Sequence, residues 1–167
     1  MNSDFLSGFK NIEKLDGPIK VKLAWLFAEW DTHNPSRRIL IQKYFPDRNQ
    51  LQKDKQPFTV DFKKRIYEAF QNVRGNYSLW GPDKEKGQWF SVNVEQLKLD
   101  WVAQNIDMLF GTDDIFLVDE LDGIILWFEN NSFKLLEGNH RISAWLNRGS
   151  PAFLSAKIFI GQTQPKH

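Results

Sequence analysis

The first half of the chain has apolar residues at helical spacing. Pro18 stands at a favourable first helical position. A broad apolar face follows it, made of Ile19, Leu23, Trp25, Leu26, Phe27 and Trp30. A second helix is predicted after the break at residues 34–36, and it ends before Pro46, because proline cannot continue a helical hydrogen-bond pattern.

A third helix is predicted over residues 60–74. Its apolar positions are Val60, Ile66, Phe70 and Val73. Thr59 is a suitable N-terminal cap, and Gly75 stands where a C-terminal cap is expected. Residues 1–87 therefore predict a mostly helical N-terminal region.

The pattern changes after the glycine- and proline-containing segment 76–89. Apolar and polar residues alternate over 89–94, which is typical of a half-buried strand, and 101–110 predicts a short helix. Further strands are predicted at 115–118, 124–128, 133–137 and 156–160. We expect an α+β protein, in which a helical N-terminal region, residues 1–87, packs on a small mixed-sheet domain, residues 88–167.

Composition limits the kinds of partner and chemistry. The chain has 22 basic and 21 acidic residues, so no global field attracts it to nucleic acid or to an anionic membrane. It has no cysteine, which excludes disulfides, thiol nucleophiles and thiolate metal sites, and fits a cytoplasmic protein. No apolar run approaches the length of a membrane span, so we expect no membrane association.

The segment LLEGNHRISAWLNRG, residues 135–149, combines a strand end, a glycine and a helix start. If the helix begins at Asn139, the peptide N–H groups of Asn139, His140 and Arg141 have no partners within the helix and favour an anion such as phosphate. Gly138 allows a ligand to approach the backbone closely. The alternative is a turn capped by Asn139 with both basic side chains in solvent, and spacing alone leaves both interpretations open.

From about Trp89 to Gly161 the chain resembles the ParB/sulfiredoxin superfamily, including the ParB-type N-terminal nucleotide-binding and nuclease-like domains. A strand leads into an acidic-Gly-x-His/Arg-Arg motif, here Glu137 to Arg141, followed by a helix, a glycine and a further strand. The resemblance implies that Gly138, Asn139, His140 and Arg141 hold the phosphates of a nucleoside triphosphate such as ATP or CTP. Asn139 stands where sulfiredoxins have their catalytic cysteine, so the resemblance does not extend to their reaction.

The candidate catalytic residues are Glu137, as a general base, and His140 and Arg141, which would stabilise developing charge. Asp119 and Asp122 are candidate Mg²⁺ ligands beside the phosphates, although carboxylates at strand ends are also typical of a charged loop. These residues predict phosphoryl chemistry, either nucleotide hydrolysis, phosphotransfer or nucleic-acid cleavage by a nuclease. We expect Arg141→Ala to abolish turnover and to leave the fold intact.

Two other functional classes remain open. The chain could be a non-catalytic interaction protein, such as an antitoxin, an immunity protein or a phage-encoded inhibitor, that binds a protein partner. It could also be a nucleotide-gated DNA-binding switch, in which case changing Arg37 and Arg38 would remove salt-dependent DNA binding.

Overall fold

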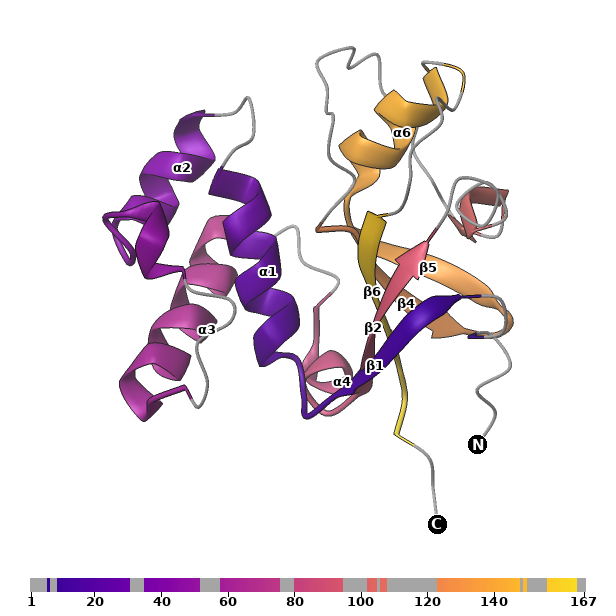
Figure 1. Ribbon diagram of the computed structural model, residues 1–167, viewed down its shortest axis with the longest axis horizontal. Helices are drawn as coiled ribbons and strands as arrows, with labels where there is room; N and C mark the ends of the chain where they lie inside the picture. Colours follow the sequence, from indigo (N-terminus) through magenta and orange to yellow (C-terminus); the bar gives the residue numbers. More distant parts are fainter. Residues whose placement is uncertain are drawn as a thin grey trace.

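The computed structural model describes residues 6, 9–30, 35–51, 58–75, 80–94, 102–104, 106–107, 123–147, 149 and 156–164. It is an α+β structure, as the sequence predicts, with helices on both faces of a sheet (Figure 1). The strands are β1 (Lys10–Leu15), β2 (Gln88–Val94), β3 (Ile106–Asp107), β4 (Ile125–Glu129), β5 (Ser132–Glu137) and β6 (Ala156–Gln162). The helices are α1 (Ile19–Trp30), α2 (Pro35–Gln42), α3 (Val60–Arg74), α4 (Pro82–Glu85) and α6 (Asn139–Asn147), with the 3-10 helix η2 (Arg48–Gln50).

The sheet is mixed, with the strand order β1-β2-β6-β4-β5-β3. Strand β4 is parallel to β6, and β3 is parallel to β5, whereas the remaining neighbours are antiparallel. Strands β2, β4, β5 and β6 confirm four of the predicted strands. The predicted strand at residues 115–118 lies outside the described residues.

The prediction of one helix over residues 101–110 is wrong in part. Residues 102–104 are helical, but Ile106 and Asp107 form β3, which pairs with Phe133 and Lys134 of β5. Local apolar spacing indicates a helix in this segment. Pairing with β5 gives the backbone of these two residues partners in the sheet, so tertiary context overrides the local preference.

Strand β1 was not predicted from the pattern of the sequence. Its residues are exposed apart from Leu15, because β1 is an edge strand paired only with β2 among the described strands. Asn11 has a positive φ of 52°, and the register shifts between Lys10 and Glu13, which marks a bulge. The division into residues 1–87 and 88–167 stays a prediction, but β1 belongs to the same sheet as β2.

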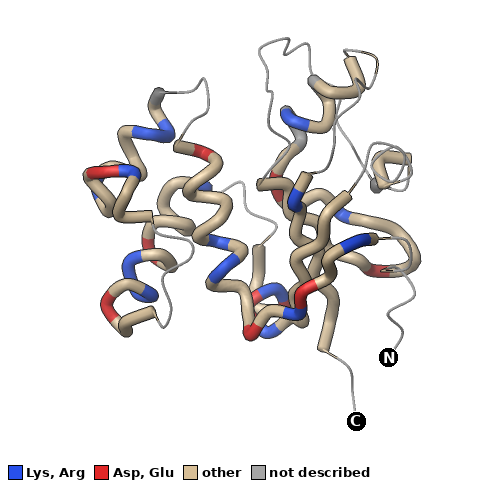
Figure 2. Tube along the Cα trace, viewed as in Figure 1, with Lys and Arg blue, Asp and Glu red and all other residues tan. Residues whose placement is uncertain are grey.

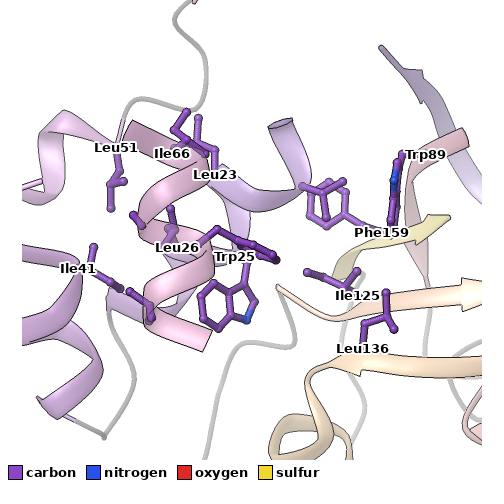
Figure 3. Packing of buried hydrophobic residues seen from close by; sticks show 14 of the residues in the cluster. Leu23, Trp25, Leu26, Ile41, Leu51, Ile66, Trp89, Ile125, Leu136 and Phe159 are labelled. Atoms are coloured by element: carbon purple, nitrogen blue, oxygen red, sulfur yellow. The ribbon is translucent and has the colours of Figure 1, made fainter. Parts of the chain in front are cut away.

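The two faces of the sheet contribute to two different hydrophobic cores. Successive strand residues point to opposite faces, so Trp89 of β2 faces one core while Phe90 and Val92 face the other. The core on the side of α6 contains Ile142 and Trp145 of that helix. The opposite core lies between the sheet and a helical layer that consists of α1, α2, η2 and α3 (Figures 1 and 3).

The core between the helical layer and the sheet contains most of the largest buried side chains of the described residues. The helical layer contributes Leu23, Trp25, Leu26, Ile41, Leu51 and Ile66, and the sheet contributes Trp89, Ile125, Leu136 and Phe159 (Figure 3). Trp127 of the sheet belongs to the same core. Helix α3 begins as predicted, because the Thr59 hydroxyl accepts a hydrogen bond from the backbone N–H of Phe62 at 3.1 Å. Gly75, with a φ of 67°, caps its C-terminal end.

Candidate functional site

The strand, glycine and helix predicted at the Glu137–Arg141 motif are confirmed. Strand β5 ends at Glu137, Gly138 follows with a φ of 109°, and α6 begins at Asn139. The carbonyl of Gly138 accepts the first helical hydrogen bond, from the N–H of Ile142 at 3.0 Å. Gly138 is therefore the N-terminal cap and offers no side chain to the first-turn N–H groups. Asn139 lies inside the helix, which corrects the alternative in which it caps the turn.

Gly138 is required by the fold itself. A Cβ atom at this position would lie 2.8 Å from Cγ1 and 3.2 Å from Cα of Ile124, which is fully buried. The positive φ is also one that residues with a side chain rarely adopt. The close approach of β5 to the start of β4 therefore accounts for this glycine without a ligand.

Arg141 joins α6 to the helical layer. Its side chain is only 9% exposed, and its Nη2 donates to Oε1 of Glu29 at 3.0 Å. Glu29 lies near the C-terminal end of α1 and is 7% exposed, so this is a buried ion pair. The other carboxylate oxygen of Glu29 accepts a hydrogen bond from Nη1 of Arg37 at 3.1 Å.

Glu137 also contacts the helical layer. Its carboxylate forms an ion pair with Nε of Arg74, the last residue of α3. Nη2 of the same arginine donates to the carbonyl oxygen of Leu136 at 3.1 Å, and its side chain is buried. The two charged residues on either side of Gly138 therefore hold two different helices, α3 through Glu137 and α1 through Arg141.

The patterns in the sequence did not single out Glu29 and Arg74. Each follows a buried aromatic residue by one helical turn, Glu29 after Trp25 and Arg74 after Phe70. A charged residue at the spacing of an apolar face is therefore the signal that could have found them, because such a charge needs a partner when it is buried.

The structure describes the other predicted site residues only in part. Asn139 and His140 are in the first turn of α6, and only their backbone is described. Asp119 and Asp122 lie outside the described residues. Within the described part of the chain, no three His, Asp or Glu side chains form a group that could hold a metal ion.

Arg37 and Arg38, the residues predicted for DNA binding, both contact α1. Arg37 pairs with Glu29, and Nε of Arg38 donates to the carbonyl oxygen of Trp30 at 2.9 Å. Basic and acidic residues alternate over the helical layer (Figure 2). Both arginines therefore have a role in joining α2 to α1.

Lys22 is a third buried cation, after Arg141 and Arg74, and lies in the first turn of α1. Lys22 of α1 is 3% exposed and forms an ion pair with Glu85 of α4. Its Nζ lies 3.9 Å from the ring centroid of Tyr67, with Phe70 and Trp80 at 5.2 and 5.3 Å. Burial lowers the pKa of Lys22 from its ordinary value of 10.5, the bond to Glu85 opposes this, and the charge of Arg74 lowers it further.

We expect Lys22→Met to keep the free energy of unfolding at pH 7 within about 1 kcal/mol of the wild type, or to raise it, because methionine fills the aromatic site without a desolvated charge. Glu85, whose side chain is 39% exposed, remains hydrated. Lys20→Met is the matched control, since the side chain of Lys20 is 39% exposed on the same helix.

The free energy of unfolding should depend differently on pH in the wild type and in Lys22→Met. Because the pKa of Lys22 is lowered in the folded state, the unfolded chain binds more protons below pH 10.5, and the wild type gains stability relative to Lys22→Met as the pH rises towards that value. Burial raises the pKa of Tyr67 from its ordinary value of 10.0, but this residue is present in both proteins, so its contribution is common to the two stability curves. Urea unfolding at pH 7 and at pH 9.5 measures the difference, and a constant difference would contradict the prediction.

Comparison of the chain with models of protein families, with curated proteins and with solved structures finds no match. None of the helices in the described residues is long and apolar enough to cross a membrane.

Proposed function

We propose that the protein binds the phosphate groups of a nucleotide or nucleic acid at the junction of β5, Gly138 and α6. The observation that carries this proposal is a helix N-terminus that follows a strand end directly, is capped by a glycine and has Arg141 in its first turn. First-turn N–H groups, the helix dipole and a guanidinium all favour a phosphate oxyanion.

The chemistry proposed for this site is phosphoryl transfer or hydrolysis. The resemblance of the motif to the ParB/sulfiredoxin superfamily supports ATP or CTP as ligand, and nuclease activity is the version with nucleic acid. Arg141 and His140 would stabilise charge on the phosphate, and Glu137, oriented by Arg74, would act as general base. Asp119 and Asp122 are proposed to hold Mg²⁺ between protein and phosphates.

Thermal unfolding against ATP, CTP, GTP and UTP, with and without Mg²⁺, tests nucleotide binding. A ligand that binds only the folded state raises the midpoint, by the equivalent of about 2.7 kcal/mol at a hundred times its Kd. The comparison variant is Glu29→Gln/Arg141→Gln, which removes the guanidinium without leaving a buried charge unpaired.

We expect at least one nucleotide to stabilise the wild type and this stabilisation to be lost in the double variant. Arg65→Gln is the matched control, because Arg65 is an exposed arginine that pairs with Asp61 on the far helix α3. A wild type that no nucleotide and no oligonucleotide stabilises would contradict the proposal.

The second candidate is a non-catalytic interaction protein. It is favoured by the fact that Glu137 and Arg141 both have structural partners in the helical layer, so the motif is accounted for by packing. Under this alternative, no nucleotide stabilises the wild type, and a specific protein partner binds equally well to the Glu29→Gln/Arg141→Gln variant.

A further inference from the structure

Trp25 carries a buried hydrogen-bond donor that lacks an acceptor. The residue is fully buried, and its Nε1 has no hydrogen-bond partner among the residues that the structure describes. Figure 3 shows the nitrogen of this indole on the side that faces the sheet, where Ile125 and Leu136 lie. Buried indole N–H groups normally have a partner, so an unpaired one indicates a position for an acceptor.

This donor lies on the face of α1 that covers the start of α6. Trp25, Ala28 and Glu29 are three and four residues apart and share one side of the helix. A Cβ atom placed on Gly123 would lie 2.9 Å from Cβ of Ala28 and 3.3 Å from Nη1 of Arg141. Glu29 itself binds Arg141. The same face of α1 therefore holds the indole donor and the carboxylate that meets the first turn of α6.

The positive charges around Glu29 exceed its own negative charge. Two guanidinium groups, Arg37 and Arg141, share one carboxylate, one on each oxygen. If Arg141 turned to another anion, Glu29 would keep Arg37 as its partner. A phosphate offers several acceptor oxygens, so it could satisfy Arg141 and the indole N–H together, whereas Glu29 in its observed position satisfies only the first.

We propose that Glu29 occupies the anion position of this site in the free protein, and that a ligand phosphate displaces it from Arg141 and accepts a hydrogen bond from Nε1 of Trp25. This inference rests on the proposed function and adds two residues to it. Trp25 is a further binding residue, and Glu29 is an internal competitor that lowers the affinity for the ligand.

Isothermal titration of the full chain with inorganic pyrophosphate tests both roles. Glu29→Gln removes the competing charge and keeps the shape of the side chain, so we expect it to lower the Kd roughly tenfold. Trp25→Phe removes the N–H donor and keeps an aromatic ring, so we expect it to raise the Kd roughly tenfold, as for loss of a hydrogen bond to a charged group. Trp89→Phe is the control, because Nε1 of Trp89 already donates to the carbonyl oxygen of Lys84.

If either Glu29→Gln or Trp25→Phe binds pyrophosphate with the same Kd as the wild type, this inference is overturned and the proposed function still stands. Absence of binding by the wild type and by Glu29→Gln, to pyrophosphate and to nucleotides alike, overturns both. If Trp25→Phe does not fold, the assigned indole N–H signal of Trp25 in the NMR spectrum of the wild type replaces it. That signal should move on saturation with pyrophosphate, and a fixed position overturns the inference.

Discussion

Replacing Glu29 with alanine is expected to lower the free energy of unfolding by about 3 to 5 kcal/mol, because the guanidinium of Arg141 would stay buried without its carboxylate. Arg141→Ala should cost less, since Glu29 retains its bond to Arg37 at 3.1 Å. The double variant Glu29→Gln/Arg141→Gln should stay close to the wild type, because it leaves no buried charge unpaired.

Urea unfolding of the wild type, the two alanine variants and their combination forms a double-mutant cycle that measures the coupling energy of this pair. Arg37→Ala is the control, because the side chain of Arg37 is 35% exposed and its loss leaves the buried pair intact. Equal and small effects of both alanine substitutions would contradict the prediction. The buried pair also changes the expectation that Arg141→Ala leaves the fold intact, so loss of activity in that variant would not by itself identify a catalytic role.

A fragment of residues 88–167 is expected not to fold. Without β1 and the helical layer, one face of the sheet would expose five buried side chains, those of Trp89, Ile125, Trp127, Leu136 and Phe159. Their burial contributes on the order of 10 kcal/mol, which is comparable with the whole stability of a domain of this size. The open edge of β2 would also favour association between copies.

Circular dichroism during heating and size-exclusion chromatography of this fragment test the prediction. We expect no cooperative transition and an aggregated or expanded species. A fragment of residues 6–167, which keeps β1, serves as the control and should unfold cooperatively. A monomeric, cooperatively unfolding fragment 88–167 would show instead that the boundary predicted from the sequence separates two independent domains.

The features that the sequence predicted correctly depend on local chemistry. The cap at Thr59, the glycine after α3 and the start of α6 after Gly138 each follow from residues within one or two helical turns. Strands β4 and β5 were predicted from their short apolar runs, and the turn that joins them at Asn130 and Asn131 has positive φ angles at both residues. Such signals are present in any short window of the sequence.

The features that the sequence did not indicate depend on distant partners. Strand β1 has few apolar residues, because it contributes only an edge to the sheet, and two residues of β3 became a strand through pairing with β5. At the candidate site, the backbone geometry was predictable, whereas the roles of Glu29 and Arg74 were not. Each of these residues meets its partner across a long stretch of chain, and periodicity carries no information about such pairs.

The pairing of Leu15 with Trp89 gives the protein a modular architecture. The chain leaves the sheet after β1 and returns beside the same point at β2, so the helical layer is an insertion into a single antiparallel hairpin. The entropic cost of closing a loop grows slowly with its length, and such an excursion leaves the threading of the other strands unchanged. Another unit could therefore replace the helical layer in evolution or in design, provided that it brings an apolar face for the sheet and counter-charges for Glu137 and Arg141.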